Sequence, residues 1–548
     1  MRPASRLLPI LFLVLLLIPA CGGEDEAPPA ARTQTPADLT PAFGDAIVWA
    51  KIADAANLLP VLSSDSASND VIELVYNALV KIDKDLNIVG DLAESFDVSD
   101  DSRTITFHLR RNVRWHDGRP FTARDCLFTY QVMVDPQTPT AYAEQFLQIE
   151  KAEAPDDYTF RVTYRRPYAR ALITWGLPLV PAHLLEGKNV VESDLARAPV
   201  GTGPYRFVKW ETGQEIALEA NPDYFEGRPY LSRVVVRVIP DMATMFLELK
   251  AGNVDWMTLT PDQYVRQTDT AFFRDNYRKY KYLDFGYTYL GFNLLNPKFQ
   301  DKRVRQAVAY ALDKDEIVQG VLLGLGRPAN GPYKPGHWAY NPAVTPYPFD
   351  PGKARSLLAE AGWEDQDGDG IREKDGRPFE FTLLTNQGNQ QRESTALIIQ
   401  QRLKDVGIAV KIRIVEWAAF LKEFVDKKRF EAVVLGWNIP LDPDLYNVWH
   451  SSQTAEGQLN FISFKNEEVD RLIDQGRFTL KIEERQKAYF RIQEILKEEA
   501  PYVFLYVPEA LPLVAARFQG IEPAPAGIVH NFIRWYVPLA RQKYKLTP

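Results

Sequence analysis

Three aspartates at alternate positions, Asp365, Asp367 and Asp369, come directly before Gly370. Carboxylate oxygens at positions 1, 3 and 5, with glycine at position 6, are typical of the first half of a calcium-binding loop. Oxygen ligands of this kind suit a hard divalent cation. These three aspartates are therefore weak candidates for a metal site.

The rest of this segment fits a calcium loop less well. Position 12 of such a loop is a glutamate, and this chain has Gly376 there, although Glu373 or Asp375 could substitute. The alternative is a polar hairpin between Trp363 and Phe379, because the segment is rich in turn-forming residues. We favour the hairpin and predict no metal.

No set of side chains in the sequence has the spacing of a reaction centre. The six histidines are scattered between His108 and His530 without the spacing of metal ligands. The sequence contains no HExxH, no paired-cysteine zinc motif, no P-loop and no Gly-x-Ser-x-Gly elbow. We therefore predict a protein that is not an enzyme and that needs no cofactor.

The first residues are typical of an export signal. Arg2 and Arg6 precede an apolar run over 7–19, and Ala20 comes directly before Cys21. A cysteine at this place resembles the lipobox of bacterial lipoproteins, in which it becomes the lipidated N-terminus. This predicts a signal peptide over 1–20, a lipidated flexible tether over 21–43 and an extracytoplasmic protein on a bacterial membrane. The alternative is an uncleaved anchor helix.

Composition excludes several classes of partner. The 548 residues have a formal net charge of −8, which argues against nucleic acid, since phosphate binding needs clustered lysine and arginine. No second apolar run long enough to span a bilayer follows the signal.

With Cys21 lipidated, only Cys126 remains, and its apolar neighbours predict a buried thiol rather than a nucleophile.

Hydrophobic patterns predict a mixed α/β protein with several lobes. A helix is expected from Asn69, because Val71, Leu74, Val75, Ala78 and Leu79 recur at helical spacing. Thr122, with Asp125 three residues later, is typical of a helix N-cap. Strands are expected at 46–50, 104–109, 205–208 and 234–239, and buried parallel strands at 381–384, 410–414 and 432–435.

Several short motifs, taken in order, resemble one protein family. They are Asp91–Phe96, Thr106–Arg110, Val113–Asp125, Gly201–Tyr205, Gly291–Asn293, Arg303–Ala307, Asp405–Ile408, Gly436–Trp437 and Asp442–Pro443. Together they resemble the family 5 extracellular solute-binding proteins, the oligopeptide and dipeptide receptors of ABC importers. The resemblance covers about 45–540, nearly the whole chain after the signal.

The resemblance implies an α/β fold of the periplasmic-binding-protein type II kind: a two-lobed clamp with an extra inserted domain. The first lobe would be discontinuous, over 44–90, 195–290 and 500–545. The inserted small domain would cover 91–194 and the second lobe 291–499. A ligand would lie between the lobes, and closure would bury it. The implied partners are a small peptide or other small polar solute and ABC permease subunits, with the protein a monomer.

The same resemblance implies which aromatic residues form the cleft. Trp437 matches a cleft wall and lies at the C-terminal end of a strand, where clefts in α/β sheets form. We include its neighbour Asn438 among the candidates. Trp417 matches a pocket tryptophan and Tyr142 a cleft-edge tyrosine. The alternative for each aromatic residue is ordinary core packing.

The chain departs from the family pattern beside Trp437. Peptide receptors have an aspartate three residues after that tryptophan, which binds the ammonium group of the ligand, and this chain has Pro440. Asp442 and Asp444 are the nearest carboxylates, and either could take that role or cap the helix that follows. The arginine of tripeptide-type receptors before the Gly-Trp pair is also missing, since the strand reads Val433-Val434-Leu435.

Peptide import is therefore the expected function, and the identity of the ligand is left open. Nickel complexes, haem, sugars and opines are carried on the same fold, and the fold does not determine the ligand. A sensor or adaptor that passes a signal to another protein instead of a permease is the alternative from a different class. An extracellular hydrolase has little support.

Overall fold

The computed structural model describes residues 39–438 and 441–545. The chain divides into two units, Met1–Leu39 and Thr40–Pro548, and every described helix and strand belongs to the second. The predicted signal peptide and Cys21 lie outside the described residues, and 39–43 contain no helix or strand. Among the described residues, no helix is long and apolar enough to cross a membrane.

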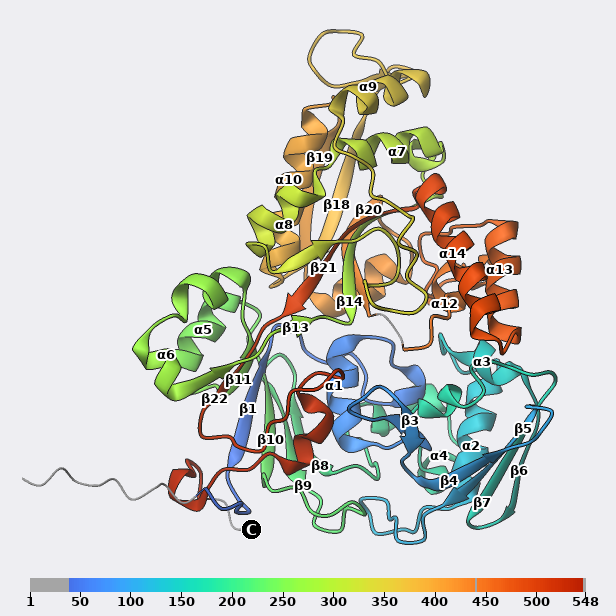
Figure 1. Ribbon diagram of the computed structural model, residues 1–548, viewed down its shortest axis with the longest axis vertical. Helices are drawn as coiled ribbons and strands as arrows, with labels where there is room; N and C mark the ends of the chain where they lie inside the picture. The colour runs from blue at the N-terminus through green and yellow to red at the C-terminus, as the bar shows by residue number, and fades with distance from the viewer. Residues whose placement is uncertain (1–38, 439–440, 546–548) are drawn as a thin grey trace, which may run out of the picture. The chain divides into compact units, whose positions relative to one another are not determined.

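A first sheet of seven strands has the order β12-β22-β11-β1-β10-β9-β8 (Figure 1). Its strands are β1 (Ala46–Lys51), β8 (Tyr205–Glu211), β9 (Glu215–Ala220), β10 (Arg233–Val238), β11 (Trp256–Thr258), β12 (Tyr277–Lys279) and β22 (Pro512–Ala515). Alternate residues of β1 point to opposite faces, as the strand geometry requires. Val48 packs with α5 (Met242–Lys250) and α6 (Ala271–Asn276), whereas Trp49 packs with α1 (Ser66–Val75).

A second sheet of seven strands has the order β13-β21-β14-β20-β18-β19, with β15 paired to β21. Its strands are β13 (Tyr282–Leu283), β14 (Gly286–Phe292), β15 (Gly326–Pro328), β18 (Glu380–Asn386), β19 (Ala409–Val415), β20 (Ala432–Asn438) and β21 (Tyr502–Ala510). The parallel pairing predicted for 381–384, 410–414 and 432–435 is confirmed, since β18 is parallel to both β19 and β20. The burial predicted for 410–414 is wrong, because β19 lies at the edge of the sheet and only its Val410 is buried. The sheet is mixed because β14 is antiparallel to β20 and β21.

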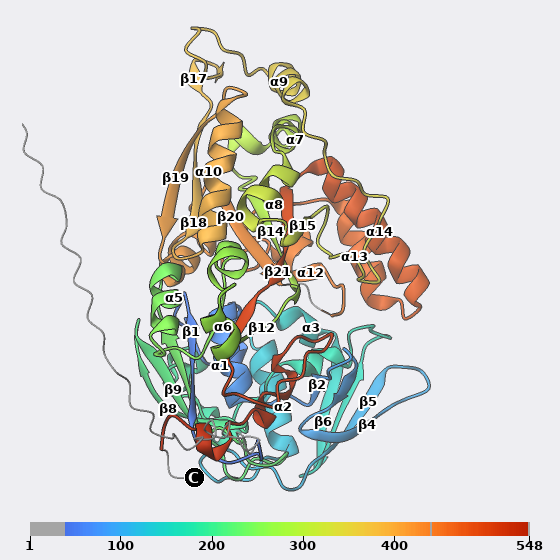
Figure 2. The same cartoon turned by 60° about the vertical axis from the view of Figure 1, so that its left-hand side comes forward.

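Helices cover both faces of the second sheet (Figure 2). One face packs against α7 (Lys302–Ala311), α8 (Lys314–Leu322), α9 (Pro351–Glu360) and α10 (Gln390–Lys404). The other packs against α12 (Tyr446–Trp449), α13 (Glu467–Phe478) and α14 (Ile482–Glu499). This three-layer arrangement explains why strands such as β20 are apolar on both faces.

The segment of the chain between β1 and β8 contains a separate antiparallel sheet of four strands, with the order β4-β5-β7-β6. Its elements are β4 (Ala93–Val98), β5 (Thr104–Leu109), α2 (Ala123–Val134), α3 (Ala143–Leu147), β6 (Ile149–Asp156), β7 (Thr159–Tyr164) and α4 (Ala182–Leu185). The predicted cap is confirmed, because the Thr122 N–H donates to the Asp125 carboxylate at 2.9 Å. Cys126 of α2 is buried, and burial raises the pKa of its thiol.

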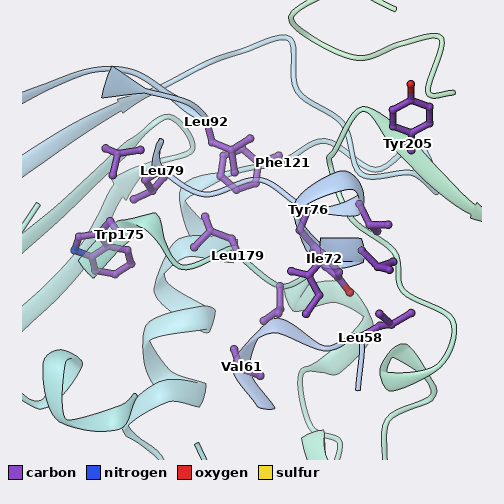
Figure 3. Packing of buried hydrophobic residues seen from close by; sticks show 14 of the residues in the cluster. Leu58, Val61, Ile72, Tyr76, Leu79, Leu92, Phe121, Trp175, Leu179 and Tyr205 are labelled. Carbon is purple, nitrogen blue, oxygen red and sulfur yellow. The ribbon is translucent and has the colours of Figure 1, made fainter. Parts of the chain in front are cut away.

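One hydrophobic core joins this segment to the first sheet (Figure 3). It contains Trp49 of β1, Ile72 of α1 and the fully buried Trp175. Tyr76 and Leu92 belong to the same core (Figure 3). The small sheet and the first sheet therefore share a continuous core.

The helix predicted from Asn69 ends earlier than expected. α1 stops at Val75, so Ala78 and Leu79 lie outside it. The Val75 carbonyl accepts a hydrogen bond from the Gly203 N–H at 2.8 Å. A neighbouring segment therefore occupies the place where the next turn of the helix would continue.

The chain crosses between the two large sheets at two adjacent points. One crossing separates β12 from β13 and the other separates β21 from β22, and the Tyr280 N–H donates to the Pro512 carbonyl at 2.9 Å between them. The boundary expected at 290 falls inside β14, and β21, which was assigned to the first lobe, pairs with β14 in the second sheet. The apolar run over 502–515 continues through the crossing, so its sequence pattern does not mark the change of sheet.

Candidate functional site

A cavity of about 790 Å³ is lined by elements that belong to both large sheets and to the small one. One wall comes from α1 and from residues near α3, and the other comes from the ends of β14 and β20, the start of α10 and the segment after β19. This volume lies in the range of binding sites for small molecules, about 300–1,000 Å³. The cavity is therefore the candidate binding site.

Trp437 and Asn438 lie at the C-terminal end of β20 and line the cavity. β20 continues through both residues, which pair with Tyr287 and Gly286 of β14, so the strand is longer than expected. The indole N–H of Trp437 donates to the Tyr502 hydroxyl at 3.2 Å, which fixes the ring against the sheet. The predicted position of Trp437 at a strand end beside a cleft is thus what the structure has.

Trp417 and Tyr142 line the same cavity from different elements. Trp417 begins the short helix α11 (Trp417–Ala419), and its indole N–H donates to the Asp65 carboxylate at 3.3 Å. Asp65 also caps α1, because it accepts the Ser68 N–H at 3.0 Å. Tyr142 precedes α3, and burial raises the pKa of its hydroxyl to about 12. These aromatic residues, far apart in sequence, therefore share one cavity.

Asp444 lines the cavity, but arginines already neutralise its carboxylate. Arg170 Nη1 donates to Asp444 Oδ2 at 2.7 Å, and Arg477 Nε lies 3.5 Å from the same oxygen. The side chains of Asp444 and Arg477 are 2% and 1% exposed. Burial alone would raise the pKa of Asp444, but Arg477 and Arg170 hold it below its usual value.

Asp442 does not line the cavity, and it is also paired. Arg485 Nη2 donates to Asp442 Oδ2 at 2.7 Å, and Arg170 Nε lies 3.7 Å from Asp442 Oδ1. Arginines take up both charges, so the contacts of Asp442 and Asp444 do not favour the ammonium role, which is one of the two alternatives left open for them. The capping alternative fits better, because Asp444 accepts the Tyr446 N–H at the start of α12, at 3.2 Å. Pro440 lies outside the described residues.

The cavity also contains charged residues that sequence reasoning missed. They are Asp65 at the N-cap of α1, Glu73 of α1, Asp284 before β14, Arg170, Arg392 of α10, and Lys422 and Asp426 after α11. The polar face of α1 gave no signal, because the polar face of an amphipathic helix usually faces water. Only the position of α1 beside the second sheet shows that this face is part of a cavity.

The three candidate metal ligands lie together in an exposed loop outside the cavity. Ligand atoms of Asp365, Asp367, Asp369 and Glu373 lie within 4.8 Å of one another. The loop is also held as a turn, because Asp365 Oδ1 accepts the Gly368 N–H at 2.8 Å. It leads into the small hairpin of β16 (Glu373–Lys374) and β17 (Arg377–Pro378). The polar hairpin therefore stays the prediction, with calcium binding as its alternative.

Known proteins resemble the chain over almost its whole length. The family model of the bacterial extracellular solute-binding proteins, family 5 (Middle), matches residues 87–458. The oligopeptide-binding protein AppA of Bacillus subtilis (strain 168) is 34% identical over 549 residues, which cover 98% of this chain and 99% of that protein.

Solved structures share the fold. The structure of Bacillus subtilis AppA with a nonapeptide matches with a TM-score of 0.87 and 34% identity, covering 91% of this chain and 100% of that one. NikZ from Campylobacter jejuni with Ni(L-His) gives 0.82 and 30%, covering 90% and 99%. DppA from Helicobacter pylori with the peptide STSA gives 0.82 and 29%, covering 90% and 98%. The predicted type II binding-protein fold is therefore confirmed.

Proposed function

Because the chain belongs to the bacterial extracellular solute-binding proteins of family 5, we propose that it is the receptor of an ABC importer that captures peptides or similar small polar solutes. The observation that carries this proposal is the cavity of about 790 Å³ between elements of the two large sheets. In this family the protein binds a solute rather than transforming it. We extend this to the chain: it performs no chemistry on its ligand.

The lining of the cavity suits a ligand with a polar backbone. Aromatic rings such as Trp437 and Trp417 offer flat apolar walls, and amide side chains such as Asn438 and Asn69 offer hydrogen-bonding groups between them. A ligand that contacts both walls stabilises the arrangement in which the walls are close, so binding selects the closed state. Peptides are favoured over metal complexes because the AppA structure, at 34% identity, contains a nonapeptide, whereas the NikZ structure, at 30% identity, contains a nickel complex.

Native mass spectrometry of the protein purified from its own cells tests this function. We expect a mixture of short peptides that is released intact on denaturation. Recovery of a nickel complex, haem or a sugar would replace the proposed ligand, and recovery of cleavage products would contradict the receptor role. A receptor that fed a signalling partner would bind the same ligand, so co-purification with permease subunits is the second readout.

Replacing Trp437 with alanine is expected to weaken peptide binding by about tenfold, because the ligand loses a flat apolar wall. Isothermal titration with the peptides recovered from the parent protein measures the change. Trp210 of β8 is half-buried outside the cavity, with its indole N–H bonded to Asp54 at 2.9 Å. Trp210→Ala is thus the matched control and should bind like the parent; equal weakening in both variants would contradict a role of Trp437 in the site.

We also propose that the exported protein is tethered through lipid on Cys21 and works as a monomer outside the cytoplasm. In membrane fractions, the parent protein should carry an acylated N-terminus at Cys21, visible by mass spectrometry. Cys21→Ala should appear in the soluble fraction with unchanged ligand affinity, since the tether is not part of the cavity. Retention of this variant on the membrane would instead support the uncleaved anchor helix.

A further inference from the structure

Six charged side chains, three of each sign, lie together where the segment of the small sheet meets the helices of the second sheet. We call them the charge cluster: Glu144, Arg170, Asp442, Asp444, Arg477 and Arg485. Glu144 and Arg170 come from the segment between β1 and β8, and the other four come from the chain between β20 and β21. Each of the six has a partner of opposite sign at 2.7–3.0 Å.

Arg477 of α13 binds the segment between β1 and β8 through both its side chain and its backbone. Its Nη1 donates to Glu144 Oε1 at 3.0 Å, and its Nη2 donates to the Tyr168 hydroxyl at 2.9 Å. Its carbonyl accepts the Ala169 N–H at 2.8 Å. The Arg477 side chain is only 1% exposed, so these contacts are shielded from water.

Arg170 makes the reverse contact, from the segment of the small sheet to the chain beside α12. Its Nη1 donates to Asp444 Oδ2 at 2.7 Å, and its Nε lies 3.7 Å from Asp442 Oδ1. Arg166 of the same segment adds a cation–π contact, with its guanidinium carbon 3.2 Å from the centre of the Phe478 ring. Each side of the contact therefore supplies guanidinium groups to the other.

The charges of the cluster balance on each side of the contact as well as across it. Glu144 and Arg170 cancel on one side, and two aspartates and two arginines cancel on the other. Each of those aspartates has an arginine of its own side within 3.5 Å. Removing one partner of a buried ion pair is costly, because it leaves an unpaired charge. Parting this contact leaves no net charge on either side, so the contact is suited to open and close reversibly.

Little apolar surface joins the two sides. Of the described hydrophobic residues between β14 and β21, only Phe478 packs against the core that the small sheet shares with the first sheet. Phe478 packs beside Tyr168, with 5.6 Å between the ring centres. Polar interfaces of this kind are typical of parts of a chain that move relative to one another.

The contact lies away from the covalent connections between the two large sheets. The chain crosses between these sheets at two adjacent points, near Tyr280 and Pro512. Figure 1 shows α3, which carries Glu144, well apart from β13 and β22 at the crossings. Because the small sheet shares its core with the first sheet, the charge cluster attaches both of them to α13 without a covalent bond. A rotation of the second sheet about the crossings would therefore part the charge cluster.

We propose that the charge cluster is a latch that holds the cavity closed and parts when the cavity opens. Arg170 and Asp444 also line the cavity, so the latch forms part of its wall. The strength of the latch sets the closed fraction of the protein before any ligand binds. The latch rests on contacts within the chain, and it does not depend on which ligand the protein takes.

X-ray scattering of the ligand-free protein tests the latch, after co-purified solute has been removed by unfolding in guanidinium chloride and refolding. Glu144 does not line the cavity, so its variants change the latch alone. Glu144→Lys places a cation beside Arg477, whereas Glu144→Gln only removes the negative charge. We expect the radius of gyration to increase from the parent protein through Glu144→Gln to Glu144→Lys. Equal radii in all three proteins would overturn the proposal.

Glu150→Lys is the matched control, since it makes the same charge reversal outside the charge cluster. Glu150 is exposed on β6 and pairs with Arg103, next to β5 of the same sheet, at 2.7 Å. This variant should keep the radius of gyration of the parent protein. If Glu144→Lys instead lost stability in urea without a change in radius, the contact would be a permanent structural one and the latch would be contradicted.

Ligand binding gives a second readout, with the peptides recovered from the parent protein as probes. We expect Glu144→Lys to bind each peptide about tenfold more weakly, the usual size for a lost charged hydrogen bond. The factor should be the same for every peptide, because a smaller closed fraction scales all apparent affinities alike. Different factors for different peptides would show that Glu144 contacts the ligand and would contradict the latch. If no peptide is recovered, the proposed function fails, and the scattering comparison still tests the latch.

Discussion

Replacing Asp444 with asparagine is expected to lower the free energy of unfolding by about 3–5 kcal/mol, because two buried guanidinium groups lose their shared carboxylate. Arg170 lies 2.7 Å and Arg477 3.5 Å from Asp444 Oδ2, and the Arg477 side chain is only 1% exposed. Urea unfolding at pH 7, followed by circular dichroism, measures the change.

The pH dependence of the stability difference between Asp444→Asn and the parent protein checks this explanation. Asp444 has a folded pKa below its unfolded value, so its contribution is present above the unfolded value and is lost as pH falls through the folded one. The difference between Asp444→Asn and the parent protein should therefore shrink below about pH 4.

Asp442→Asn is the matched control. Asp442 is 13% exposed and has one close arginine, Arg485 at 2.7 Å, so this variant should lose less stability than Asp444→Asn. If Asp444 instead held the ammonium group of the ligand, Asp444→Asn would weaken peptide binding and leave the free energy of unfolding unchanged. That outcome would support the ammonium role, one of the two alternatives left open by the sequence, and contradict the role of Asp444 as the partner of two arginines.

Local patterns predicted the elements of this fold well because their causes are local. The apolar runs that became β18 and β20 could be recognised because a strand buried on both faces has no polar alternation, whereas β19 is an edge strand with exposed Lys411 and Arg413. The cap formed by Thr122 and Asp125 lies within a single turn, so its signal is contained in four residues. Trp437 could be placed at a strand end because the apolar strand directly before it is recognisable from its own residues.

The partners of the site could not be predicted, since they come from distant parts of the chain. Arg170 and Asp444 are separated by 274 positions, and no pattern around Asp444 announces a guanidinium group. Trp417 and Asp65 are separated by 352 positions. The ammonium role considered for Asp442 and Asp444 relied on nearness in sequence to Trp437, whereas arginines neutralise both charges in the structure.

The crossing of the chain between the two large sheets could not be predicted from the sequence for a different physical reason. β21 and β22 are consecutive apolar strands, and Leu511 between them is also buried. A strand that leaves one sheet and enters another keeps its burial, so hydrophobicity does not change at the crossing. Only the pairing of β21 with β14 and of β22 with β11 reveals that the segment belongs to both sheets.

A methyl group at Gly201 is expected to lower the free energy of unfolding by about 3 kcal/mol or more, because it would overlap with backbone atoms. A Cβ at Gly201 would lie 1.8 Å from the Val75 carbonyl oxygen and 2.6 Å from the Val75 carbonyl carbon. The segment cannot easily move away, since the Gly203 N–H donates to that oxygen at 2.8 Å and the Gly201 carbonyl accepts the His116 N–H at 2.8 Å. Urea unfolding measures the loss.

Gly320→Ala is the control with the opposite sign. Gly320 is exposed within α8, and a Cβ there would meet its nearest neighbour at 3.8 Å, so alanine should add about 0.5–1 kcal/mol through helix propensity. Gly201→Ala should also weaken peptide binding, because Val75 ends α1, which lines the cavity, and a displaced helix end changes that wall. A Gly201→Ala variant as stable as the parent protein would mean that the 201–203 segment can leave Val75, and the early end of α1 would then need another cause.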